Sequence, residues 1–202
     1  MIMNRVEFFL MNNPIRGFIQ ETIEIKKFLK LSRLPPGKTV LEIGCGDGKG
    51  TKLIKKYFRP RQIYAVDLDE RMIVRAKKKN TDPTISFEVA DVCSLRYDDN
   101  TFDAIFDFGV IHHIPNWKDC LDELKRVLKP NGELIIEDLS IDTFTSSIFG
   151  RILKKVFRHP YEHMYTREKF IKYVEDIGLK IVAEESYYPF ATIKYFVLIA
   201  NK

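Results

Sequence analysis

Val40-Leu41-Glu42-Ile43-Gly44-Cys45-Gly46-Asp47-Gly48 is an apolar run that ends in a carboxylate and continues into a turn with three alternate glycines. The apolar run predicts a buried strand, and the glycines allow a ligand to lie directly against the main chain. Residues 49–58 have helical periodicity, so the N–H groups of the turn should lie where a helix begins. Glycine-rich turns also close ordinary strand-to-helix connections, so this stretch alone does not decide between a ligand site and a plain turn.

Two further apolar runs end in a carboxylate. Asp67 follows residues 62–66, at the spacing expected for the acid that binds a pair of ribose hydroxyls in a nucleotide-binding βαβ unit. Asp91 follows the apolar run 85–89. Carboxyl ends of parallel strands share one edge of a sheet, so the pattern predicts a crevice there. The alternative is that each aspartate only caps the helix that follows it.

The chain alternates between strand and helix patterns as far as residue 139. The expected strands are 38–43, 62–67, 84–89, 101–108 and 132–139. The expected helices are 18–29, 48–58, 69–79 and 116–128, the last with Asn116 as its N-cap. This alternation, with strands that are almost continuously apolar, predicts an α/β fold with a doubly wound, mostly parallel sheet.

The pattern changes after residue 139. Residues 140–160 have no strand pattern, and 148–158 combine an apolar helical stripe with four basic residues on the other side. Thr166 should cap a helix through residue 177, which Gly178 closes. Two strand-like runs follow, 179–187 and 192–200, joined by an expected turn at 188–190.

Length and composition suit one globular domain over residues 1–202. The chain is 45% hydrophobic and shows neither a membrane-spanning run nor a signal-peptide pattern, so a cytoplasmic location is expected. Cys45, Cys93 and Cys120 are far apart, which argues against a disulfide framework or a metal site. The net charge of +5 is compatible with anionic partners but does not by itself indicate one.

Four blocks, taken together, resemble the class I S-adenosylmethionine-dependent methyltransferases, in particular the small-molecule branch that includes ubiquinone and menaquinone C-methyltransferases. The blocks are V-L-E-I-G-C-G-D-G at 40–48, A-V-D-L-D at 65–69, A-D-V at 90–92 and L-K-P-N-G-E-L-I-I at 128–136. The resemblance implies a seven-stranded Rossmann-like sheet with an antiparallel last strand and a helical lid after strand five. It divides the domain into a helical cover (1–37), a cofactor-binding core (38–139), a lid (140–165) and a C-terminal helix and strand pair (166–202).

The resemblance also implies S-adenosylmethionine as the cofactor, and it assigns ten residues to its site. The backbone of 44–48 would run along the amino-acid tail and sugar, with Glu42 supporting the loop or binding the tail's ammonium group. Phe108 would lie near the tail and the reactive sulfur. The ten residues are Glu42, Gly44, Cys45, Gly46, Gly48, Asp67, Leu68, Asp91, Val92 and Phe108.

The nucleoside contacts are implied by the same resemblance. Asp67 would accept hydrogen bonds from both ribose hydroxyls, and Leu68 would pack on the adenine. Asp91, together with the Val92 amide, would bind the adenine edge.

The catalytic residues stay unassigned, because methyl transfer from a sulfonium needs positioning and desolvation and no universal catalytic side chain. His112 or His113, after the fourth strand, could act as a general base, although a histidine there is more often structural. Tyr161, His163 and Tyr165 are further candidates on the acceptor side.

The expected acceptor is a small, apolar or lipid-like molecule covered by the lid. Residues 148–158 could instead lie on an anionic membrane. Nucleic acid is a weaker expectation, because residues 107–110 lack the Asn/Asp-Pro-Pro-aromatic motif of many adenine N-methyltransferases. An RNA methyltransferase, a non-catalytic cofactor-binding protein and an NAD-dependent oxidoreductase stay open as alternatives.

Overall fold

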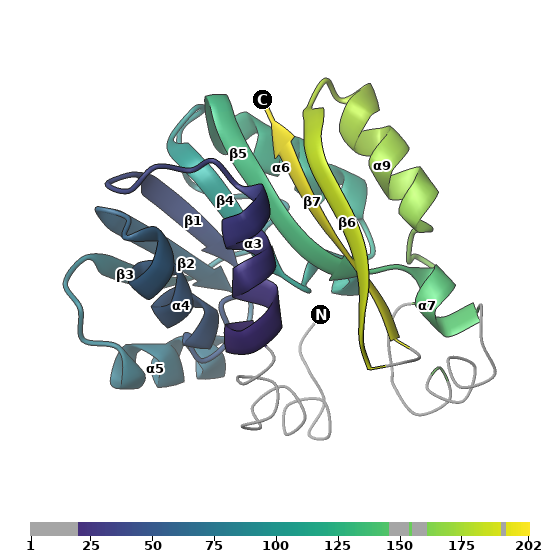
Figure 1. Ribbon diagram of the computed structural model, residues 1–202. Helices are drawn as coiled ribbons and strands as arrows, with labels where there is room; N and C mark the ends of the chain where they lie inside the picture. Colours follow the sequence, from purple (N-terminus) through teal and green to yellow (C-terminus); the bar gives the residue numbers. More distant parts are fainter. Residues whose placement is uncertain (1–19, 146–153, 155–160, 191–192) are drawn as a thin grey trace.

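The computed structural model describes residues 20–145, 154, 161–190 and 193–202, and a seven-stranded sheet forms its centre (Figure 1). The strand order is β3-β2-β1-β4-β5-β7-β6. The first five strands are parallel, and β7 pairs antiparallel with both β5 and β6. The fold is therefore the predicted one. The strands are β1 (Thr39–Ile43), β2 (Gln62–Asp67), β3 (Ile85–Val89), β4 (Phe102–Phe108), β5 (Leu128–Leu139), β6 (Lys180–Phe190) and β7 (Ile193–Asn201).

Helices cover both faces of the sheet. Side chains of α3, α4 and α5 pack with one face, and those of α6 and α9 pack with the other. Figure 1 shows α3 and α4 in front of the sheet and α6 behind it. The helices are η1 (Gln20–Glu24, a π-helix), α3 (Ile25–Leu31), α4 (Lys49–Phe58), α5 (Glu70–Lys79), η2 (Ile111–His113, a 3₁₀-helix), α6 (Trp117–Val127), α7 (Ile141–Thr145) and α9 (Arg167–Asp176).

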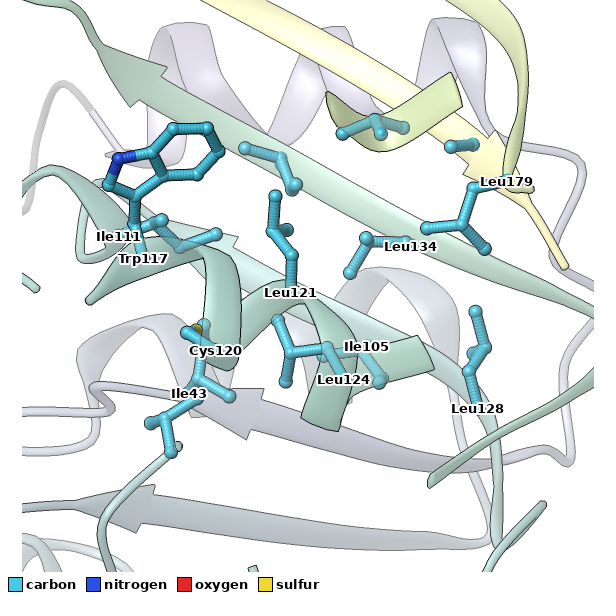
Figure 2. Packing of buried hydrophobic residues seen from close by; sticks show 14 of the residues in the cluster. Ile43, Ile105, Ile111, Trp117, Cys120, Leu121, Leu124, Leu128, Leu134 and Leu179 are labelled. Atoms are coloured by element: carbon cyan, nitrogen blue, oxygen red, sulfur yellow. The ribbon is translucent and has the colours of Figure 1, made fainter. Parts of the chain in front are cut away.

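The strands are apolar throughout because both of their faces are covered. Successive residues of β4 alternate between the two core clusters, with Ile105 on the α6 side and Phe106 on the α3 side. Figure 2 shows the α6 side, where Leu121 and Leu124 lie beside Ile105. All five residues of β1 are buried, as expected for a strand at the middle of a parallel sheet.

Helix α9 begins and ends as predicted, since Thr166 accepts a hydrogen bond from the Lys169 amide (3.2 Å) at its start. The Asp69 carboxylate, for which no cap was predicted, accepts one from the Arg71 amide (2.9 Å) at the start of α5. Gly178 follows α9 with a φ of 84°. Asn116 is the N-cap residue of α6, as predicted, but its side chain makes no capping hydrogen bond and donates to Asp119 instead.

Two strand boundaries differ from the predicted ones. Strand β5 begins at Leu128 because this residue pairs with Phe102 ahead of an irregularity in the register. Strand β6 continues through Phe190, which pairs with Ile193, so residues 188–190 belong to a strand and not to a turn. The predicted helical stripe 148–158 lies outside the described residues except for Lys154. In the described part of the chain, no helix combines the length and the apolar character needed to cross a membrane.

Candidate functional site

A cavity of about 220 Å³ lies at the carboxyl ends of β1, β2 and β4. Its lining includes nine of the ten residues predicted to bind the cofactor, which are Glu42, Gly44, Cys45, Gly46, Asp67, Leu68, Asp91, Val92 and Phe108. Gly48 does not line it. This glycine is the N-cap residue of α4, where a Cβ atom would lie 2.5 Å from the Asn80 side chain and 3.2 Å from Phe87.

The glycine loop exposes its main chain to the cavity. Gly44 has a φ of 58°, and a Cβ atom there would lie 2.2 Å from the Val110 side chain, so only glycine allows this close approach. Gly46 also has a positive φ, 53°, but a Cβ atom there would meet nothing within 4 Å. The open space in front of Gly46 is therefore a cradle in which a ligand can touch the backbone.

Glu42 lies beneath the loop and is 2% exposed. The Thr51 hydroxyl of α4 donates a hydrogen bond to Glu42 Oε2 (2.5 Å). A Cβ atom on Gly50 would lie 2.2 Å from Glu42 Oε1, so the glycine makes room for the carboxyl group. Burial raises the pKa of Glu42 to about 8, because the charged form is removed from water. At neutral pH this carboxyl group therefore holds a proton unless a cation comes close to it.

Asp67 fixes the glycine loop to the end of β2. Its carboxylate accepts hydrogen bonds from the Gly46 amide (2.9 Å) and the Asp69 amide (2.8 Å). Burial raises the pKa of Asp67, and the two amide hydrogen bonds act against that shift. Each oxygen can accept a further hydrogen bond, so the carboxylate can still bind hydroxyl groups of a ligand.

The remaining predicted residues form a wall around the same space. Leu68 is 45% exposed although it is apolar, and Val92 is buried. Asp91 is exposed and accepts a hydrogen bond from the Cys93 amide (2.9 Å). The Phe108 ring packs on Phe28 of α3 with its centroid 5.0 Å away.

The opposite wall comes from the segment after β4. There η2 and the loop after it place His113, Ile114, Pro115 and Asn116 on the cavity. The sequence pointed to His113, whereas several other lining residues were missed. Most of these are chain neighbours of predicted residues, but Gln20 and Met72 carried no sequence signal. The missed lining residues are Gln20, Asp47, Lys49, Gly50, Met72, Gly109, Val110, Ile114, Pro115 and Asn116.

A buried polar network lies behind this wall. The Asp138 carboxylate at the end of β5 bonds to Nδ1 of His112 and accepts hydrogen bonds from the His112 amide (3.0 Å) and the Tyr165 hydroxyl (2.7 Å). His112 is 5% exposed and does not line the cavity. Its ring lies 4.0 Å, between centroids, from that of His113, which does line it. The two histidines therefore occupy different positions, and Asp138 was not predicted from the sequence.

The other acceptor-side candidates are more distant from this network. Tyr161 packs against Phe144 with ring centroids 5.2 Å apart, and His163 is exposed. Neither residue lines the cavity. Among the described residues, no cluster of three or more His, Cys, Asp or Glu side chains could hold a metal ion.

Comparison with known proteins finds a match over most of the residues that form this site. A family model described as a methyltransferase domain matches residues 41–136, which hold the glycine loop and all three strand-end carboxylates. The match ends within β5, before the network residue Asp138.

Curated relatives match between one half and two thirds of the chain. A phthiotriol/phenolphthiotriol dimycocerosates methyltransferase of Mycobacterium tuberculosis is 33% identical over 51% of this chain and 38% of its own length. A 2-methyl-6-phytyl-1,4-hydroquinone methyltransferase of Synechocystis is 30% identical over 61% of this chain and 40% of its own length. The chain thus spans about two fifths of the length of these curated relatives.

The fold comparison extends over nearly the whole chain. A SAM-dependent methyltransferase from Aquifex aeolicus has a TM-score of 0.75 and 24% identity, and the match covers 98% of both chains. The matched sequence, the strand order and the cavity agree with one another. Residues 41–136 are therefore similar to a methyltransferase domain, and the fold of the chain is that of a SAM-dependent methyltransferase.

Proposed function

We propose that the protein transfers a methyl group from S-adenosylmethionine to a small acceptor of apolar or lipid-like character. One observation carries this proposal. A single cavity joins the predicted cofactor residues to a second wall made of Val110, His113, Ile114 and Pro115. A cofactor and an acceptor bound against these two walls would share one enclosed space.

The cofactor fits the residues that are present. The open space in front of Gly46 admits the amino-acid tail and sugar to the backbone, and the Asp67 carboxylate has acceptor capacity left for two ribose hydroxyls. Leu68 offers an exposed apolar surface to the adenine. Asp91 and the Val92 amide would contact the adenine edge, and Glu42 would support the loop or bind the tail's ammonium group.

The chain's own contribution is positioning and exclusion of water. S-adenosylmethionine, when bound, supplies a methyl group on a positively charged sulfur. Phe108 is 5% exposed and holds an apolar surface beside the tail position, which keeps water away from the reacting atoms. The two walls would hold cofactor and acceptor in line, and such orientation alone accounts for a large share of the rate.

His113 is the group that would accept a proton from an acceptor hydroxyl or amine. It lines the cavity, and an imidazole changes protonation near neutral pH. His112 would act as its positioning residue, since Asp138 fixes the His112 ring and that ring stacks on His113. An acceptor that ionises without help would not need this base.

The apolar character of the acceptor rests on two lines of support. The side of the cavity opposite the cofactor residues is built largely from Val110, Ile114 and Pro115. The two curated relatives are named for a mycobacterial lipid and for a phytyl-substituted hydroquinone.

Calorimetry with S-adenosylmethionine, S-adenosylhomocysteine and NAD tests the cofactor. We expect the first two to bind and NAD not to bind. Binding of NAD alone would overturn the proposal in favour of an oxidoreductase.

A labelling experiment tests the acceptor. The protein is incubated with methyl-labelled S-adenosylmethionine and a cell extract, which is then separated into lipid, aqueous, RNA and protein fractions. We expect label in the lipid fraction. Label in RNA would assign a different acceptor class, and tight cofactor binding without label in any fraction would favour a non-catalytic role.

A variant of His113 tests its role as proton acceptor independently of cofactor binding. His113→Ala should bind the cofactor as the wild type does and should lose about a hundredfold in transfer rate to an acceptor that must lose a proton. Addition of imidazole should restore part of that rate. His163→Ala, at an exposed position away from the cavity, is the control.

A further inference from the structure

The helices on the two faces of the sheet differ sharply in charge. On one face, α3, α4 and α5 carry three, four and five basic residues, with a single acidic residue, Glu70, among them. On the other face, α6 and α9 each carry three basic and three acidic residues. The positive charge of the described chain is therefore concentrated on one side.

Ion pairs neutralise only part of this charge. Acidic groups from other elements pair with about half of the twelve basic residues. Lys52 of α4 and Lys77 and Lys78 of α5 are exposed, and no acidic side chain of the described residues pairs with them. These three lysines leave a net positive surface.

The three lysines belong to one region because the end of α5 lies beside the start of α4. The Lys79 ammonium pairs with the Asp47 carboxylate in the glycine loop. Asn80, the residue after α5, lies against Gly48 at the N-cap of α4. We call Lys52, Arg71, Val74, Lys77 and Lys78 the basic surface.

The basic surface also contains an exposed apolar side chain. Val74 is 46% exposed, and it lies three residues after Arg71 and four before Lys78, so all three share one side of α5. Such a surface is chemically complementary to anionic lipid head groups, because the cations are attracted to the head groups and the exposed apolar side chain can enter between them.

We infer that the basic surface binds an anionic membrane. The inference goes beyond the proposed function, because surface binding does not depend on which acceptor is methylated. RNA fits less well, since the described residues of α3, α4 and α5 offer no exposed aromatic ring for base stacking: Phe28 and Phe58 are buried, and Tyr57 is half-buried beneath Lys56.

The basic surface lies close to the cavity, which affects how an acceptor could reach it. Met72, in the first turn of α5, and Leu68, just before that helix, both line the cavity. A membrane in contact with α5 would therefore lie beside the cavity mouth. Acceptors dissolved in that membrane could enter without crossing water.

Vesicle flotation with the full chain tests the inference. We expect the protein to float with vesicles of phosphatidylcholine and phosphatidylglycerol at low salt, to stay behind with pure phosphatidylcholine, and to lose binding at high salt. No flotation, or equal flotation with both kinds of vesicle, would overturn it.

Two charge-reversal variants test whether the protein binds anionic vesicles through the basic surface. Lys52→Glu/Lys78→Glu should weaken partitioning into anionic vesicles by about thirtyfold, from the loss of two cations near the surface. Lys169→Glu/Lys172→Glu, at exposed positions of α9, changes the net charge equally and should leave partitioning unchanged. Calorimetric cofactor binding confirms that both variants are folded, and an equal loss in both would overturn the assignment to this surface.

A third variant separates a membrane from another polyanion. Val74→Ser should weaken vesicle binding by about fivefold, because a half-exposed valine no longer inserts among the lipids. Binding to polyuridylate is measured at the same salt concentration. The protein could instead bind this RNA more tightly than it binds vesicles, with both affinities unaltered by Val74→Ser. That result would assign the surface to nucleic acid and overturn the inference.

Discussion

The cofactor half of the cavity, at the ends of β1, β2 and β3, is held by hydrogen bonds that stay within one βαβ unit, whereas the wall after β4 is backed by a network of residues from distant parts of the chain. In the first half, Asp67 bonds to the amide of its near neighbour Asp69, and Glu42 bonds to Thr51, nine residues away. In the second half, Asp138 joins His112 and Tyr165, which lie 26 and 27 residues from it. The comparison teaches that the cofactor half is held within a single βαβ unit, which can recur in many sequences, while the network behind the acceptor wall depends on strands that become neighbours only in the folded sheet.

The largest expected effect is on the pH dependence of stability, and it comes from the Glu42 carboxyl group at the base of the cofactor half. The pKa of Glu42 is about 8 in the folded chain and close to its ordinary value of 4.5 in the unfolded chain. Between these values the unfolded state binds fewer protons than the folded state, so the free energy of unfolding falls as the pH rises. The loss should reach up to about 5 kcal/mol by pH 8.

Urea unfolding at several pH values measures this loss. Glu42→Gln keeps the shape of the side chain and its contact with Thr51 but cannot ionise, so its stability should vary much less over the same range. If the stability of the wild-type protein stayed level from about pH 5 to about pH 8, Glu42 would ionise normally. The cofactor and acceptor halves of the cavity would then differ less than the structure indicates.

The second effect concerns cofactor binding. Asp67→Ala should lower the affinity for S-adenosylmethionine by about a hundredfold, because two charge-assisted hydrogen bonds to the ribose would be lost. Asp82→Ala is the matched control, since Asp82 also accepts a hydrogen bond from a backbone amide two residues on but lies outside the cavity. Calorimetry distinguishes the two variants. Equal affinities in both would sink the assignment of the ribose contact.

The third effect tests the acceptor half. Tyr165→Phe removes the hydroxyl that donates to Asp138 and should lower the stability by about 1–2 kcal/mol. Tyr187→Phe is its counterpart on the other face of the sheet, where the hydroxyl donates to Glu137 (2.9 Å), and should lower the stability by a similar amount. Only Tyr165→Phe should also slow methyl transfer, because its partner Asp138 holds His112. Equal rates of methyl transfer in the two variants would show that the network of Asp138, His112 and Tyr165 takes no part in the reaction.

The smallest effect is expected at the rim of the cavity. Leu68→Ala should weaken cofactor binding about threefold with almost no loss of stability, because the side chain is half exposed and only its ligand contact is removed. Val89→Ala removes a similarly exposed apolar side chain outside the cavity and should change neither quantity. A loss of affinity in both variants would point to a general effect on the fold.

The same difference between local and long-range contacts explains how much of the site could be predicted from the sequence. Glycines that need a positive φ and carboxylates at strand ends are local features, so eight of the cavity's residues were predicted from three short blocks and a ninth, Phe108, from the end of the fourth strand. The pairing of His112 with Asp138 could not be predicted, because it depends on which strands become neighbours. Gln20 reaches the cavity from a π-helical turn that no periodicity indicated.

Strand boundaries show the same limit. Residues 188–190 contain a proline and favour a turn locally, yet pairing with β7 holds them in β6. Asn116 has good N-cap chemistry, but its side chain finds Asp119 instead of a backbone amide. In each case a partner chosen by the tertiary structure overrides the local preference.

The insertion of β7 between β5 and β6 has a consequence for the order in which the sheet is made. The last of the seven strands to be synthesised occupies an interior position, so β5 keeps an open edge and β6 has no neighbour until β7 has left the ribosome. During that interval the apolar edge of β5 is available to other nascent chains. A chain cut before Ile193 would keep residues 41–136, which match the methyltransferase domain, but its sheet would end at β5.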